Sequence, residues 1–196
     1  MFRCYFRLPE DQFVFCSFNN AYKYSPDMIK LWASILNNCP RSVLWLLEDN
    51  VWSKANLLAD FKRHGIESER IYFAGRIDPR DYLSRFKAAD LFLDTCPYNA
   101  GTTANDALFA GLPVLTLSGQ TYVSRMAGAL LHRLGLHPLI TFNGETYCQT
   151  AIALAQDRDR LDHYKNVITS TVPIAFNTET IARNFESKIL GLLGRI

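Results

Sequence analysis

Two kinds of apolar pattern alternate along the first two thirds of the chain. Short runs that are apolar at nearly every position are typical of strands buried on both faces of a parallel sheet, and they occupy 13–18, 43–47, 70–74, 91–93 and 114–117. Between them, apolar residues recur every three to four positions, as in amphipathic helices. Strands and helices that alternate at a spacing of about 20 residues indicate right-handed βαβ units. We therefore predict an α/β fold with a doubly wound, Rossmann-like parallel sheet.

Turn residues mark the expected helix ends. Ser25 and Asp78 each stand before a proline, as helix-capping residues often do. Gly111 follows a predicted helix, where a left-handed backbone favours glycine. We expect further helices over 82–89, with its apolar stripe buried, and over 122–134.

The last third of the chain is expected to be mainly helical. A short strand over 138–140 is followed by helical patterns that begin near Glu145 and continue over 161–168 and 178–193, with Pro173 separating the last two.

The length of 196 residues suits one domain better than two. We expect a single unit over 1–196, with its core at about 12–170 and C-terminal helices at about 145–194.

Composition excludes several classes of partner. The net charge is +2 with scattered Lys and Arg, so the chain has no electrostatic footprint for nucleic acid or a membrane surface. The sequence lacks an apolar run near the ~20 residues that span a bilayer, and its first residues lack a secretion signal. Its five cysteines include no C-x-x-C pair, which argues against a disulfide framework or a zinc site. We expect a cytoplasmic protein with reduced thiols.

The most informative stretch runs from 91 to 113, where a strand, a loop of small residues and a helix start follow one another. Backbone amides of such a loop, together with the helix dipole, attract phosphate. Gly101 allows close approach, and Thr102 and Thr103 add hydroxyl groups. Asp106, one turn later, is placed to accept hydrogen bonds from ribose hydroxyls, so the stretch suggests a nucleotide site. The alternative from local sequence is a threonine helix cap with a solvated first-turn acid.

Loops that follow the strands of a doubly wound sheet share one edge, where ligands bind. By this rule 18–23, 75–82, 94–103 and 117–124 converge. Lys23 would then reach an anion held at the helix after Gly101, although a solvated surface lysine is the alternative.

Other patterns offer little chemistry. The turn at 118–121 is a second candidate for anion binding because it follows a strand and opens a helix. The four histidines show no metal-ligand spacing, and Asp157-Arg158-Asp159 lies between two helices, where capping explains it. The sequence shows no recognisable catalytic base.

Seven short motifs recur in the order found in a known family: Leu8-Pro9-Glu10-Asp11, Phe18-Asn19-Asn20-Ala21-Tyr22-Lys23, Ser42-Val43-Leu44-Trp45-Leu46-Leu47, Leu93-Asp94-Thr95, Gly101-Thr102-Thr103, Gly111-Leu112-Pro113 and Ser124-Arg125. Together they resemble the C-terminal catalytic lobe of the O-linked N-acetylglucosamine transferase family, including its SPINDLY-like members, over about 8–192. The resemblance implies the nucleotide-sugar-binding lobe of a two-lobed B-type glycosyltransferase. It further implies that an N-terminal lobe and tetratricopeptide repeats lie outside this chain, and that the N-terminal lobe supplies much of the acceptor site.

The resemblance also assigns roles to individual residues. Lys23 matches a lysine that faces the diphosphate, and Asn20 takes the place of a phosphate-contacting glutamine. Thr102 and Thr103 match phosphate-binding threonines, and Asp106 matches the ribose-binding acid.

The chain departs from the family pattern in two places. Pro79 and Tyr82 replace a lysine and a histidine that contact the nucleoside in better-known members; Arg80 is a nearby substitute, and Tyr82 would stack on uracil. Ala100-Gly101 replaces a Gly-His pair, so a histidine beside the phosphates is missing.

The resemblance implies metal-independent, cofactor-free, inverting transfer of N-acetylglucosamine from UDP-N-acetylglucosamine to Ser or Thr hydroxyls of a protein acceptor. Lys23 and the helix start after Gly101 would stabilise the leaving diphosphate. Two alternatives stay open: transfer of another sugar, such as glucose or fucose, and a nucleotide-binding or interaction module without transferase activity. We expect the isolated chain to bind UDP weakly and to be inactive.

Overall fold

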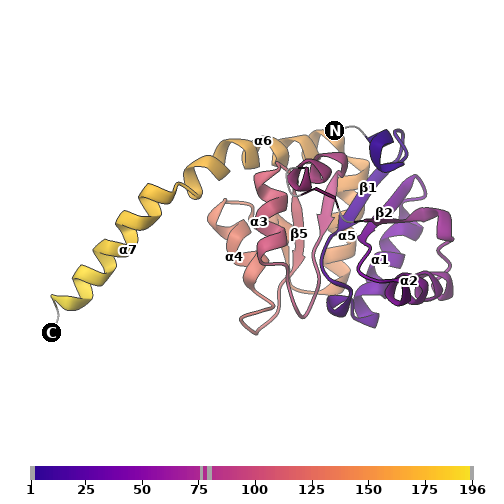
Figure 1. Ribbon diagram of the computed structural model, residues 1–196, viewed down its shortest axis with the longest axis horizontal. Coiled ribbons are helices and arrows are strands. Elements are labelled where there is room, and N and C mark those ends of the chain that lie inside the picture. Colours follow the sequence, from indigo (N-terminus) through magenta and orange to yellow (C-terminus); the bar gives the residue numbers. More distant parts are fainter. Residues whose placement is uncertain (1–2, 76, 79–80, 195–196) are drawn as a thin grey trace.

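Six parallel strands form one sheet in the computed structural model, which describes residues 3–75, 77–78 and 81–194 (Figure 1). The order across the sheet is β3-β2-β1-β4-β5-β6. The strands are β1 (Phe13–Ser17), β2 (Ser42–Leu47), β3 (Ile71–Ala74), β4 (Leu91–Leu93), β5 (Val114–Leu117) and β6 (Ile140–Thr141). The winding direction reverses between β1 and β4, which confirms the predicted doubly wound, Rossmann-like sheet.

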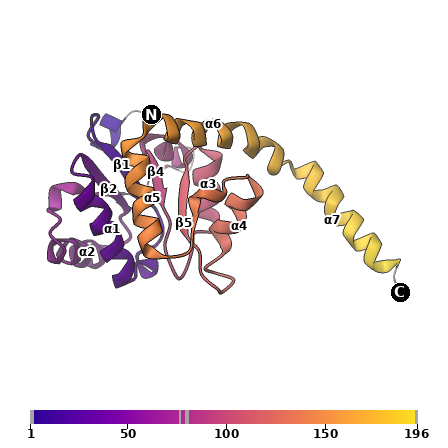
Figure 2. The ribbon, with the colours of Figure 1, turned by 180° about the vertical axis from the view of Figure 1, so that it is seen from behind.

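Helices cover both faces of this sheet. The α-helices are α1 (Pro26–Asn38), α2 (Val51–Arg63), α3 (Thr102–Phe109), α4 (Met126–Arg133), α5 (Gly144–Gln156), α6 (Arg158–Ala175) and α7 (Thr178–Leu193). The 3₁₀ helices are η1 (Arg3–Phe6), η2 (Ala21–Lys23), η3 (Ser68–Arg70), η4 (Tyr82–Ala88) and η5 (His137–Leu139). Helices α1 and α5 pack together on one face, where the Trp32 indole donates to the Tyr147 hydroxyl at 3.1 Å (Figure 2). Helices α3 and α4 lie on the other face (Figure 1).

The apolar strand runs account for the core. Phe15, Trp45 and Phe92, on three neighbouring strands, are almost completely buried. Burying such side chains contributes about 1.5–3 kcal/mol each relative to leaving them exposed. Because β1, β2 and β4 are covered on both faces, they are apolar at nearly every residue.

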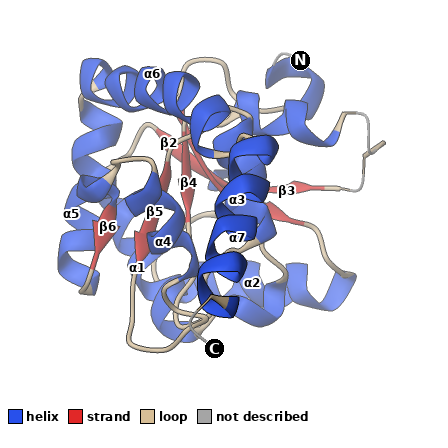
Figure 3. Cartoon of the chain, turned by 90° about the vertical axis from the view of Figure 1, so that its left-hand side faces the viewer, coloured by secondary structure: helices blue, strands red, loops and turns tan. Residues whose placement is uncertain are grey.

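One buried carboxylate fastens the edge of the sheet where the strands begin. Asp90, directly before β4, accepts the backbone N–H of Val14 at 2.8 Å and pairs with Arg3 and Arg158. These two ion pairs hold η1 and the start of α6 against the sheet. Helix α6 runs across the top of the view in Figure 3. Asp157 caps α6 by accepting the Arg160 N–H at 2.9 Å, as the capping interpretation of that motif predicts.

The helix predicted over 82–89 is instead the 3₁₀ helix η4. Of the apolar stripe expected to be buried, Phe86 and Ala89 are buried, but Leu83 is 44% exposed. Arg85, outside that stripe, is buried as well. In a 3₁₀ helix three residues make a turn, so a stripe spaced for 3.6 residues per turn does not define one face; Leu83 faces outward while the rest of the stripe faces inward.

Three other predicted boundaries are wrong. Helix α4 begins at Met126 rather than 122, because the Ser124 side chain and backbone close a turn with Thr121 and Gly119 first. The last strand is Ile140–Thr141, preceded by η5. Pro173 lies inside α6, which continues to Ala175; in the last turn the proline removes only one late hydrogen bond.

Helix α7 extends away from the rest of the molecule (Figures 1 and 2). All of its described side chains are exposed, including apolar ones such as Phe185. Within the described residues, no helix combines the length and apolar character needed to cross a membrane.

Candidate functional site

The candidate site lies at the point where the winding of the sheet reverses. Strands β1 and β4 are neighbours, so the loops that follow them meet beyond their carboxyl ends. The first loop contains η2 with Lys23, and the second, 94–101, leads into α3. The predicted convergence of these two loops is confirmed.

Lys23 connects the two loops directly. Its ammonium nitrogen donates to the carbonyl oxygen of Asn99 at 3.1 Å and lies 4.0 Å from the centre of the Tyr98 ring. Burial lowers the pKa of Lys23, while the Asp94 carboxylate raises it again. Lys23 is therefore a positioned, half-buried cation rather than the freely solvated lysine of the alternative interpretation.

The loop before α3 is shaped by Asp94. One carboxylate oxygen accepts the backbone N–H groups of Thr95 at 2.8 Å and Ala100 at 2.7 Å, and the other accepts the Thr116 hydroxyl at 2.6 Å. Burial raises the pKa of Asp94 to about 7, although these three donors and Lys23 oppose the shift. Asp94 holds the loop from inside the core and does not reach the surface.

The start of α3 carries free polar groups. Gly101 is the N-cap residue and supplies no side-chain cap. Within the described residues, the hydroxyls of Thr102 and Thr103 make no hydrogen bond, so the alternative interpretation of a threonine helix cap is wrong. The first-turn amides and both hydroxyls remain available to an anion, which the helix dipole favours.

A cavity of about 300 Å³ brings most of the predicted residues together. Its lining includes Asn20, Lys23, Gly101, Thr102 and Thr103. All five were singled out from sequence, and they come from both sides of the β1–β4 junction.

The same cavity is lined by two residues that sequence reasoning missed. Asn19 is 2% exposed and donates to the Thr95 hydroxyl at 3.1 Å, but its side-chain oxygen has no partner in the described part of the chain. Tyr98 supplies the ring beneath the Lys23 ammonium. The sequence signal for Asn19 was its position next to Asn20 in the loop after the first strand. No sequence signal pointed to Tyr98.

Tyr82 and Asp106 form a second group, on the side of α3 that faces η4. Burial raises the pKa of Tyr82, and the neighbouring Asp106 carboxylate raises it further. Asp106 is half-buried at the surface of α3 and does not belong to the core. Arg80, the other residue predicted here, lies outside the described residues, as does Pro79.

Arg85 completes this group and was also missed. Its guanidinium lies 4.5 Å from both the Phe18 and Tyr82 rings, and its Nε is buried without a partner among the residues described. A buried cation stacked on rings holds Tyr82 in place. In the sequence it was hidden inside an apparently ordinary helix.

The turn at 118–121 was the second candidate for anion binding. The prediction is wrong for two of its backbone N–H groups, because both are already hydrogen-bonded within the chain. The Gly119 N–H donates to the Ser124 carbonyl at 2.8 Å, and the Thr121 N–H donates to the Ser124 hydroxyl at 3.0 Å. These groups are satisfied within the chain and are not free for a ligand.

In the described part of the chain, no group of three or more His, Cys, Asp and Glu side chains is placed to hold a metal ion. The absence of a metal or cofactor requirement stays a prediction.

Comparison with known proteins gives consistent matches. The family model described as glycosyl transferase family 41 matches residues 1–184. The UDP-N-acetylglucosamine–peptide N-acetylglucosaminyltransferase of Caenorhabditis elegans is 33% identical over 159 residues, covering 81% of this chain and 14% of its own length. A probable enzyme of the same description, SEC of Arabidopsis thaliana, is 32% identical over 183 residues, covering 91% of this chain and 19% of its own.

A solved structure agrees with these relatives. A mutant of the Thermobaculum terrenum O-GlcNAc transferase superposes with a TM-score of 0.81 at 29% identity, covering 84% of this chain and 32% of that one. The TarM structure from S. aureus, 8% identical with a TM-score of 0.70, shares the fold. The chain thus spans less than a fifth of the length of the two curated relatives and about a third of the matched structure.

Proposed function

The chain belongs to glycosyl transferase family 41, and from this premise we propose that it is the donor-binding half of a transferase that moves N-acetylglucosamine from its UDP ester to protein Ser or Thr hydroxyls. The relatives named as peptide N-acetylglucosaminyltransferases support this donor and acceptor.

One observation carries the proposal: Lys23 and the free start of α3 line the same cavity. Transfer of the sugar breaks its bond to the diphosphate, and negative charge grows on the departing oxygen. The ammonium of Lys23 is fixed before reaction by the Asn99 carbonyl and the Tyr98 ring, and the first-turn amides of α3 are fixed by the helix itself. The hydroxyls of Thr102 and Thr103 lie beside them and, within the described part of the chain, are free to donate. Such preorganised donors stabilise developing charge without reorganising. Asn20 also lines this cavity.

The nucleoside is assigned to the η4 side of α3. Asp106 would accept hydrogen bonds from the ribose hydroxyls, because a carboxylate one turn into the helix repels phosphate but binds neutral hydroxyls. The ring of Tyr82, which Arg85 contacts at 4.5 Å, would stack on the base. The diphosphate would then cross the end of α3 toward Lys23.

The remainder of the enzyme is also part of the proposal. The described site has cationic and hydroxyl donors but no assigned base for the acceptor hydroxyl, so an N-terminal lobe would supply that group and much of the acceptor site. We place tetratricopeptide repeats before that lobe and the enzyme in the cytoplasm, where the five unpaired cysteines would stay reduced. No metal or cofactor is assigned a role.

The proposal is tested in two steps. UDP is titrated into the 196-residue chain by calorimetry, with cytidine diphosphate as a base control and uridine as a control without phosphate. UDP is expected to bind more tightly than either; absence of binding would exclude the nucleotide site.

The full-length protein is then incubated with radiolabelled UDP-N-acetylglucosamine, UDP-glucose or GDP-fucose and with protein acceptors. Transfer from the first donor is expected. Transfer from another donor alone would replace the sugar in the proposal, and UDP binding without any transfer would identify a nucleotide-binding module instead.

A further inference from the structure

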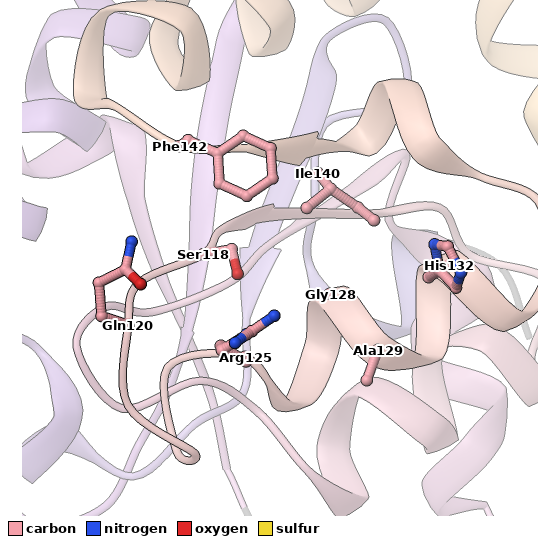
Figure 4. A pocket seen from close by; sticks show the side chains of 9 residues that line it. Ser118, Gln120, Arg125, Gly128, Ala129, His132, Ile140 and Phe142 are labelled. Carbon is pink, nitrogen blue, oxygen red and sulfur yellow. The ribbon is translucent and has the colours of Figure 1, made fainter.

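A second hollow opens on the other side of the α3 start. It has a volume of about 670 Å³ and shares Gly101, Thr102 and Met126 with the cavity that contains Lys23. It continues into a hollow of about 450 Å³, with which it shares Gln120, Arg125 and Ala129 (Figure 4). We call these two hollows together the α3–α4 groove. The groove is therefore continuous with the proposed diphosphate site.

The groove is distinct from the nucleoside side of the site. Asp106 lies on the flank of α3 that faces Tyr82, whereas the next residue back, Asn105, lines the groove on the flank that faces α4. The start of α3 separates the two. A donor with its nucleoside at Tyr82 and its diphosphate at Lys23 thus leaves the groove open.

The groove offers hydrogen-bonding groups suited to a polypeptide backbone. Gln120 presents a side-chain amide that makes no hydrogen bond with any described residue. Asn105 also lines the groove, and its side-chain oxygen is buried without a partner among the described residues. An amide both donates and accepts, as each residue of an extended peptide does.

Apolar side chains also line the groove. Met126 and Leu130 line the first hollow, and Ile140 and Phe142 line the second; Phe142 is 74% exposed. In Figure 4 the Phe142 ring and Ile140 lie across the hollow from α4. This surface would contact side chains on either side of an acceptor hydroxyl.

Arg125 carries the one permanent charge among the described residues that line the groove. Its guanidinium forms no ion pair or hydrogen bond with the described residues, and Figure 4 shows it pointing into the space between α4 and Ile140. A single unpaired cation on an apolar surface favours one carboxylate. Nucleic acid would require several such cations.

We propose that the acceptor polypeptide passes through the α3–α4 groove in an extended conformation, and that Arg125 selects acceptors with an acidic side chain near the modified Ser or Thr. This inference rests on the proposed function and adds the substrate preference of the same site.

The test uses the full-length protein and synthetic peptides with one Ser in an Ala/Gly background. A single Asp is moved through the positions on either side of that Ser, and each peptide has a partner with Asn in place of Asp. Because an exposed ion pair contributes modestly, kcat/KM is expected to favour Asp by about threefold to fivefold at one or two positions. Arg125→Gln abolishes this preference and Arg125→Lys retains it.

Lys62→Gln is the matched control, since it removes the same charge from the exposed last turn of α2, on the far side of the molecule (Figure 1). It should leave the Asp preference intact, and all variants should bind UDP equally. An Asp preference that survives in Arg125→Gln, or no preference at any position in the unmodified protein, would overturn the inference.

Binding measurements separate this failure from failure of the proposed function. Anisotropy of the fluorescent Asp and Asn peptides is measured on the same proteins with UDP present. If no sugar is transferred but Asp peptides bind in an Arg125-dependent way, the transferase assignment fails and the peptide site stands. If transfer proceeds while peptide binding ignores Arg125, the inference alone fails.

Discussion

The ammonium of Lys23 lies 3.1 Å from the carbonyl oxygen of Asn99, two residues before the N-cap of α3. This bond joins the loop after β1 to the loop after β4 across the reversal of the sheet. It fixes a cation beside a helix start whose first-turn amides have no acceptor among the residues that the structure describes.

Replacing Lys23 by alanine in the full-length protein should lower kcat by about 10²–10³-fold, the usual cost of removing one donor to developing charge. Lys23→Arg should retain part of the activity because it keeps the charge. Steady-state kinetics measure the effect, with Lys30→Ala on the exposed side of α1 as the control. Undiminished turnover in Lys23→Ala would remove Lys23 from the mechanism.

Asp106→Asn should weaken UDP binding by roughly tenfold, because a hydrogen bond to an ionised acceptor contributes about 1.5–3 kcal/mol in a desolvated site and less at a half-buried one. The comparison ligand is 2′,3′-dideoxy-UDP, which lacks both ribose hydroxyls. Its affinity should be the same for the native chain and the variant. Equal losses for the two ligands would show that Asp106 does not contact the ribose.

Asp94 should make stability depend on pH. Its carboxyl keeps a proton in the folded chain up to about pH 7 but releases it near the ordinary value of 3.8 when unfolded. Between these values the folded chain binds more protons, so the free energy of unfolding contributed by Asp94 falls as pH rises from about 4 to 7. Above pH 7 this loss is complete.

Asp94→Asn is a close match for the protonated form. The amide oxygen can still accept the Thr95 and Ala100 N–H groups, while the Thr116 hydroxyl rotates to accept from the amide nitrogen. Urea unfolding at a series of pH values should show that the variant gains stability relative to the native chain as pH rises from 4 to 7. Parallel pH curves for the two proteins would contradict the raised pKa of Asp94.

Asp90→Ala should lower the free energy of unfolding by about 3 kcal/mol, because it leaves the Arg3 guanidinium and the Val14 N–H without their buried acceptor. Asp11→Ala removes an exposed partner of Arg41 and should change it by less than about 1 kcal/mol. Both are measured by urea denaturation at pH 7. Similar losses of unfolding free energy in the two variants would show that the Asp90 ion pairs do not stabilise the fold.

Deleting residues 178–196 should leave the unfolding free energy of the rest nearly unchanged. None of the described side chains of α7 is buried, and Asn177 caps α7 itself by accepting the Thr180 N–H. Denaturant unfolding gives the free energy of unfolding of the full and shortened chains, and light scattering compares their molar masses in solution. A loss of more than about 1 kcal/mol would indicate that α7 packs on the body.

Much of the candidate site followed from sequence because it is built on short-range features. A strand, a small-residue loop and a helix start are contiguous in the chain, and the apolar strand runs predict a parallel sheet. In that fold the loops after β1 and β4 must share an edge, so Lys23 and Thr102 could be placed together without coordinates.

The remaining features depend on contacts between distant residues. Periodicity could not show that Arg85 stacks on Phe18, that the Asn99 carbonyl receives Lys23, or that a groove joins α3 to Arg125. Each depends on how helices of unequal length pack against the sheet, and 3₁₀ segments such as η4 change which side chains turn inward. By itself the sequence determined the order of the elements and the edge at which the ligand site lies, because burial on both faces requires apolar strands. Only the tertiary structure decided which polar groups remain free there, because hydrogen bonds within the chain compete with a ligand for the same donors.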